Sequence, residues 1–85
     1  MNKSVLVLGV GPSEGLGVAL CKKFAEEGYD VFGCGRSEDN MNSLSDIEVK
    51  NGSIQGIVGD VTQENDVLKI FEIIDSNGKP LESVI

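Results

Sequence analysis

The sequence of 85 residues contains no histidine and no tryptophan, one tyrosine, two cysteines, and seven basic residues against 14 acidic ones. Without histidine, Ser/His/Asp and Cys/His catalytic groups are excluded and a metal site is not expected. The net charge of −7 argues against nucleic acid or an anionic membrane as a partner, because those surfaces attract clusters of Lys and Arg. The apolar runs are also too short to span a bilayer.

The two cysteines and the amino-terminal residues indicate the cellular compartment of the protein. Cys21 lies in a helical pattern and Cys34 at the end of a strand pattern, so we expect both to be small buried hydrophobic residues. Met1 is followed by an apolar run of strand length with no small-residue cleavage site after it. We therefore expect a cytoplasmic protein, in which a disulfide is not expected.

Glycine is plentiful, with 11 residues, and four of these glycines lie within Val5–Gly17. This stretch reads as a buried strand, a glycine-rich loop and the start of a helix. Glycine has no Cβ, so such a loop can approach a pyrophosphate while the N–H groups at the start of the helix point at its charge. The sequence therefore predicts a dinucleotide-binding turn, and a tight turn without a ligand is the alternative.

Strand and helix patterns alternate along the whole chain. We predict strands over Ser4–Val10, Tyr29–Cys34, Ile54–Val58 and Leu81–Ile85. Between them we predict a helix from Leu16 ending near Gly28, a short helix within 38–52 carrying Met41, Leu44 and Ile47, and a helix capped by Thr62 with an apolar stripe at Val67, Ile70, Phe71 and Ile74.

This order predicts one domain over residues 1–85, an α/β fold of the Rossmann type. Right-handed crossovers give a partial, doubly wound parallel sheet of about four strands in the order 3-2-1-4. A sheet of this size is only partly covered by helices. Its open strand edges favour association, so a homo-oligomer is one expected state.

The glycine spacing is Gly11-x-x-x-Gly15-x-Gly17, which resembles the cofactor loop of the short-chain dehydrogenase/reductase family. That family usually has Thr before the first of these glycines, where this chain has Val10, but a subset begins the loop with Gly-x-Gly-Pro, as Gly9–Pro12 does. The resemblance implies that Gly11, Ser13, Gly15, Leu16 and Gly17 surround the phosphates and ribose of a nicotinamide cofactor.

The end of the second strand carries Gly35, Arg36 and Ser37. Dinucleotide folds that bind NAD have an acidic residue near this position for the ribose 2′-hydroxyl. Here a guanidinium and a hydroxyl are available instead, and they suit a 2′-phosphate. The sequence therefore favours NADP over NAD, with a solvated turn Arg as the alternative. A methyl-donor site is disfavoured, because it would also want an acid at this point.

Asp60 and Val61 follow the end of the third strand. In the family that the chain resembles, an Asp-Val pair at this point meets the adenine of the cofactor, so the resemblance assigns Asp60 and Val61 to adenine. An ordinary helix-capping acid is the alternative for Asp60.

The family's catalytic Tyr-x-x-x-Lys pair does not occur in these residues. The one tyrosine is Tyr29, and Gly33 stands where the Lys would be. We expect Tyr29 to be a core or rim residue, and the chain to be the amino-terminal, NADP(H)-binding part of an oxidoreductase that ends before the catalytic segment. The rival hypothesis is a non-catalytic nucleotide-binding or interaction module of the same fold.

Overall fold

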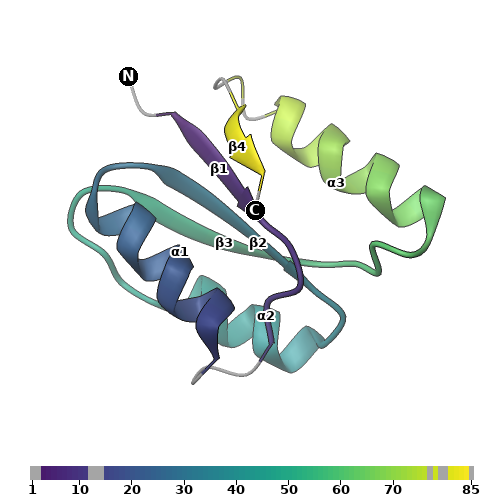
Figure 1. Cartoon of the computed structure of the whole chain (residues 1–85), viewed down its shortest axis with the longest axis horizontal. Coiled ribbons are helices and arrows are strands. Elements are labelled where there is room, and N and C mark those ends of the chain that lie inside the picture. Colours follow the sequence, from purple (N-terminus) through teal and green to yellow (C-terminus); the bar gives the residue numbers. More distant parts are fainter. Residues whose placement is uncertain (1–2, 12–14, 77, 79–80, 85) are drawn as a thin grey trace.

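A computed structural model describes residues 3–11, 15–76, 78 and 81–84 of the chain. Its elements follow in the order β1 (Ser4–Val7), α1 (Leu16–Glu26), β2 (Asp30–Gly35), α2 (Glu38–Ser45), β3 (Ser53–Val58), α3 (Glu64–Ser76) and β4 (Leu81–Val84). The strands form one parallel sheet in the order β3-β2-β1-β4 (Figure 1). The predicted α/β fold and strand order are confirmed.

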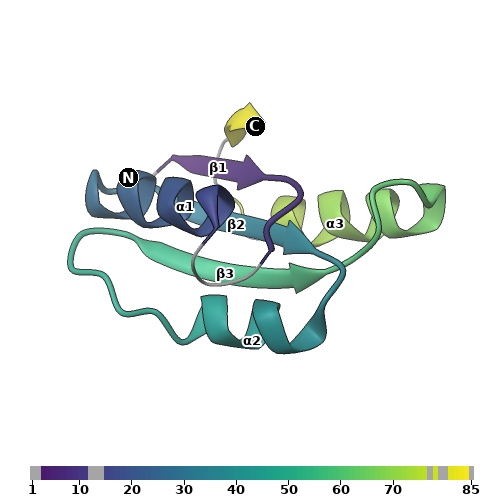
Figure 2. The ribbon, with the colours of Figure 1, turned by 60° about the horizontal axis from the view of Figure 1, so that its bottom comes forward.

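Two apolar cores cover the two faces of this sheet. Val5 and Val7 of β1 point to the side of α1 and α2, whereas Leu6 points to the side of α3. Figures 1 and 2 accordingly place α3 on the opposite side of the sheet from α1 and α2. Because β1 is buried on both faces, its sequence is apolar without alternation, as is typical of parallel sheets.

The first core contains Cys21 and the second contains Cys34, and both thiols are fully buried. The predicted burial of the two cysteines is therefore confirmed. Burial raises the pKa of the Cys21 thiol to about 11. Burial also raises the pKa of Cys34, and the nearby Asp66 and Asp60 carboxylates raise it further. Neither thiol ionises near neutral pH, so both behave as small hydrophobic side chains.

The end of α1 has the hydrogen bonds of a Schellman motif. Gly28, with φ +102°, donates its N–H to Ala25 O, and Tyr29 donates to Phe24 O. The rings of Tyr29 and Phe24 meet edge to face with centroids 5.6 Å apart, which supplies the apolar contact of this motif. The predicted stop near Gly28 is confirmed, and Tyr29 is a partly buried residue at the core's rim.

Some local predictions differ from the structure. Helix α2 ends at Ser45, so Ile47 lies beyond the helix that was predicted to carry it and packs against the first core from there. The first strand ends at Val7, three residues early, because the chain turns at Gly9, which has φ +70°. Thr62 does not cap α3, which begins at Glu64; Thr62 instead donates to the Asp60 carboxylate. Within the predicted stripe of α3, Ile70 and Ile74 are buried, but Phe71 is 41% exposed.

Glycine lets α2 pack closely on β3. A Cβ added at Gly56 would overlap the backbone carbonyl oxygen of Met41 and lie 2.9 Å from its carbonyl carbon. The Met41 backbone cannot move aside for a Cβ in the way that the end of a flexible side chain could. The contact therefore fixes the spacing between α2 and the edge of the sheet.

We predict that Gly56→Ala lowers the free energy of unfolding by about 2 kcal/mol, the usual scale of overpacking. Gly11→Ala is the matched control, because a Cβ there has nothing within 4 Å, and its effect should stay within about 0.5 kcal/mol. Urea denaturation followed by circular dichroism measures both. Equal stability of the two variants would contradict the packing argument.

Candidate cofactor-binding site

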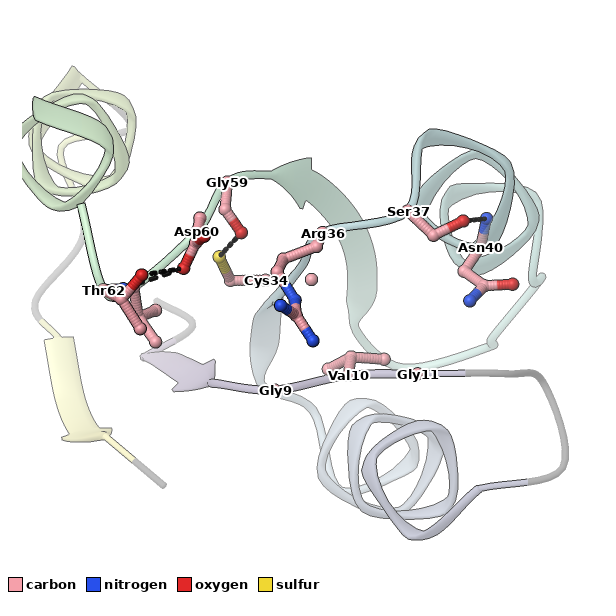
Figure 3. Close-up of a pocket in the computed structure, with 12 residues that line it drawn as sticks. Gly9, Val10, Gly11, Cys34, Arg36, Ser37, Asn40, Gly59, Asp60 and Thr62 are labelled. Carbon is pink, nitrogen blue, oxygen red and sulfur yellow. Dashed lines mark hydrogen bonds between the residues drawn. The ribbon is translucent and has the colours of Figure 1, made fainter.

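A cleft of about 490 Å³ opens where the carboxyl ends of β1, β2 and β3 meet. Its walls come from the β1–α1 loop, the end of β2 with the start of α2, and the β3–α3 turn (Figure 3). The lining residues are Gly9, Val10, Gly11, Cys34, Gly35, Arg36, Ser37, Asn40, Gly59, Asp60, Val61 and Thr62. Parallel α/β sheets bind ligands at this edge, where loops can form a crevice.

The cleft brings together five of the nine predicted site residues: Gly11, Arg36, Ser37, Asp60 and Val61. Gly15, Leu16 and Gly17 are not among its lining residues. Gly15 is the N-cap of α1, Leu16 is 77% exposed in the first turn, and Gly17 packs against Val10. Ser13 lies outside the described residues.

The start of α1 leaves backbone N–H groups without a side-chain cap. Gly15 offers no side chain to cap the helix, and no acidic residue occupies the first turn. The first intrahelical bond runs from Ala19 N–H to Gly15 O. The N–H groups before Ala19 therefore have no partner within the helix, and they carry the positive end of its dipole.

The end of β2 contributes a cation and a hydroxyl. Arg36 follows β2 directly, and its side chain extends into the cleft between the β1–α1 loop and Asp60 (Figure 3). Ser37 caps α2, and its Oγ accepts the Asn40 N–H at 3.3 Å. As an acceptor there, Ser37 keeps its hydroxyl proton for another partner. The acidic residues of this turn, Glu38 and Asp39, do not line the cleft.

The turn after β3 carries the cleft's carboxylate. Asp60 Oδ1 accepts from Thr62 Oγ1 at 2.7 Å and from Thr62 N–H at 2.9 Å. These two bonds hold the pKa of Asp60 below its usual value, and Arg36 lowers it further. Asp60 is therefore ionised at neutral pH and faces the cleft as an acceptor.

Asn40 lines the cleft but was not predicted as a site residue, although its place in the sequence indicates it. It lies three residues after the N-cap Ser37 in the first turn of α2, so it must lie beside the residues that follow β2. Gly59 was likewise missed as a lining residue. A Cβ added there would lie 3.2 Å from Ile70 Cδ1 and 3.6 Å from Cys34 Sγ, so its contacts come from distant elements.

A parallel sheet with a glycine-rich first turn and a cleft at its carboxyl edge defines a Rossmann-type nucleotide-binding protein. The sequence matches the short chain dehydrogenase family model over residues 3–85, and the chain belongs to that family. Family membership implies a nicotinamide dinucleotide as cofactor.

Three relatives give the scale of the likeness. The chain is 32% identical over 75 residues to dehydrogenase/reductase SDR family member 11 of Homo sapiens, covering 84% of this chain and 28% of the relative. It is 37% identical over 71 residues to glucose 1-dehydrogenase of Gluconobacter oxydans, covering 81% and 26%. It is 44% identical over 42 residues to a probable NADP-dependent dehydrogenase of Haemophilus influenzae, covering 49% and 17%. The chain thus spans less than a third of the length of these relatives.

None of the helices in the described part of the chain has the length and apolar composition that a membrane span requires. The same residues bring together no group of three or more His, Cys, Asp or Glu side chains that could hold a metal ion.

We predict that Thr62→Val raises the pKa of Asp60, because it removes the hydroxyl donor that stabilises the carboxylate. Since the folded-state pKa is depressed, this interaction stabilises the fold above the unfolded pKa of about 3.9 and is lost as pH falls through the folded value. Titration of the Asp60 carboxyl carbon by NMR measures the shift. Thr62→Ser, which keeps a hydroxyl, should leave the pKa low. An equal pKa in the Val and Ser variants would contradict the assignment.

Proposed function

We propose that the chain is the NADP(H)-binding part of a short-chain dehydrogenase/reductase that transfers hydride between NADP(H) and a carbonyl or alcohol substrate. The observation that carries this proposal is the end of β2. Arg36 extends into the cleft there, Ser37 has a hydroxyl proton to donate, and no carboxylate follows the strand directly at the point where NAD-binding folds place one.

The donors around the cleft fit the groups of the cofactor. The N–H groups at the start of α1, which have no partner within the helix, suit the pyrophosphate, with Gly11, Ser13, Gly15, Leu16 and Gly17 as the proposed surrounding residues. Arg36 and Ser37 suit the 2′-phosphate, since a guanidinium binds phosphate with two parallel hydrogen bonds. Asp60 and Val61 suit the adenine. The name of the Haemophilus relative, a probable NADP-dependent dehydrogenase, supports the same cofactor.

The nicotinamide would supply the hydride, and these residues hold and orient the cofactor. The chain has a net charge of −7 and would repel an anionic cofactor as a whole. Arg36 neutralises the 2′-phosphate locally, and the start of α1 offsets the charge of the pyrophosphate. We further propose that the protein works in the cytoplasm.

We predict that the purified chain binds NADPH about ten- to a hundredfold more tightly than NADH, the range of one or two charge-assisted hydrogen bonds. Arg36→Ala should abolish this difference, because it weakens the binding of NADPH and leaves the binding of NADH unchanged. Fluorescence titration at fixed ionic strength measures both affinities.

The control for charge is Lys50→Ala, which removes an exposed cation from the segment before β3, at the opposite edge of the sheet. It should leave the preference intact. Equal affinity of the unaltered chain for the two dinucleotides, or the same loss in both variants, would contradict the 2′-phosphate assignment.

We predict that these 85 residues bind NADPH but do not oxidise it with carbonyl substrates. The one tyrosine, Tyr29, precedes β2 and therefore lies at the amino edge of the sheet, away from the cleft at the carboxyl edge. It packs against Phe24 instead. Loss of NADPH absorbance with a panel of ketones and aldehydes is the assay. Measurable turnover by the pure chain would contradict this division between binding and chemistry.

A further inference from the structure

The edge strand β3 has backbone N–H groups that point away from the sheet. In β3 and the two residues that follow it, the odd-numbered N–H groups point toward the side of β2, as Ser53 donates to Tyr29 O and Gly59 to Gly35 O. The even-numbered positions face the open edge, and two of them find side-chain acceptors: Gly56 N–H donates to Ser45 Oγ at 2.7 Å, and Asp60 N–H donates to Asp66 Oδ2 at 2.9 Å. Asp66 therefore bonds the backbone just where the strand enters the cleft.

Asp60 is held at three of its polar groups. Besides the N–H bond to Asp66, its carbonyl oxygen accepts the Gln63 N–H at 2.9 Å, and its Oδ1 accepts two bonds from Thr62. Within the described part of the chain, Asp60 Oδ2 and the adjacent Val61 N–H have no hydrogen-bond partner. An acceptor and a donor are thus left side by side in residues that line the cleft.

We propose that Asp66 is a positioning residue for base recognition: its carboxylate holds the Asp60 N–H so that Asp60 Oδ2 and Val61 N–H face the edge of the adenine. Adenine presents a donor, its exocyclic amine, beside an acceptor, its N1. The free pair on the protein is complementary to that edge. This proposal rests on the proposed function, since it assigns the base end of the same cofactor.

The location of Asp66 explains why it can hold this turn. It lies in the first turn of α3, four residues before Ile70, and therefore on the helix face that packs against the sheet. Ile70 and Ile74 anchor that face in the second core. A second cavity, of about 420 Å³, is lined by Asp66, Asp60 and Arg36. Without the Asp66 carboxylate, the turn has open space into which it can move.

The test compares NADPH with its reduced hypoxanthine analogue, in which the amine is replaced by an oxygen and N1 carries a proton. That base presents an acceptor and a donor in the reversed order, so the unaltered chain should prefer NADPH by about ten- to a hundredfold. Asp66→Ala should bring the affinity ratio close to one. Asp66→Asn keeps an acceptor oxygen and should retain most of the preference.

Glu64→Ala is the matched control, because it removes an exposed carboxylate from the same turn of α3. It should leave the affinity ratio unchanged. A general effect of charge or of helix stability would instead change the ratio in Glu64→Ala as well. An unchanged ratio in Asp66→Ala, or equal loss in Asp66→Ala and Glu64→Ala, would overturn the proposal.

A measurement without ligand separates this proposal from the proposed function. Amide hydrogen exchange at Asp60 should be about tenfold faster or more in Asp66→Ala than in the unaltered chain, and close to the unaltered rate in Asp66→Asn. Unchanged protection at Asp60 would overturn the positioning role even if NADPH binds. If the unaltered chain binds neither dinucleotide, the proposed cofactor is wrong, and so is the role of Asp66 in recognising its base.

Discussion

The cleft depends on the packing of Val10 against the end of β2. Val10 is buried and donates its N–H to Cys34 O at 2.8 Å, so the chain leaving β1 stays against β2 after the strand has ended. Glycines make room for it: a Cβ at Gly35 would overlap Val10 O, and one at Gly17 would lie 3.1 Å from Val10 Cα. Val10 therefore fixes the distance between the loop, the second strand and the start of α1.

The chemistry of the cleft follows from this arrangement. The ends of β2 and β3 lie side by side, with Gly35 paired to Val58, which brings Arg36 close enough to Asp60 to lower its pKa. Among the described residues that line it, the cleft therefore carries the Arg36 guanidinium and the Asp60 carboxylate. The Cys34 thiol also lines the cleft and stays protonated, and it donates a hydrogen bond to the Gly59 carbonyl oxygen with an Sγ–O distance of 3.7 Å. The cleft thus has polar walls above a floor without charge.

Much of this architecture could be predicted from the sequence, because it rests on periodic burial. The unbroken apolar run of β1 and the positions of Ile70 and Ile74 in α3 reflect the two faces of the sheet directly. The strand order follows from right-handed crossovers between short elements. Arg36 and Asp60 could be found because each lies within two residues of a strand's carboxyl end, and the carboxyl ends of parallel strands meet at one edge.

The features that could not be predicted depend on contacts between distant residues. Thr is a common N-cap residue, but Asp60 and Gln63 close a turn through the Gln63 N–H and the Asp60 carbonyl oxygen. Helix α3 therefore begins only at Glu64. Phe71 fits the apolar stripe by spacing, yet no second helix of the described part of the chain packs beside α3, and Phe71 stays partly exposed. The bond from Asp60 N–H to Asp66 joins a strand end to a helix turn, and no periodicity indicates it.

The central claim is that one dinucleotide occupies the cleft at the carboxyl edge of the sheet. The most direct test is an ¹⁵N-resolved NMR titration of the chain with NADPH. We expect the largest shifts at the amides of Gly11, Leu16, Arg36, Asn40 and Val61, with little change at Lys50 and Ser53 on the opposite edge. Shifts spread evenly over the chain, or concentrated at that opposite edge, would contradict the account.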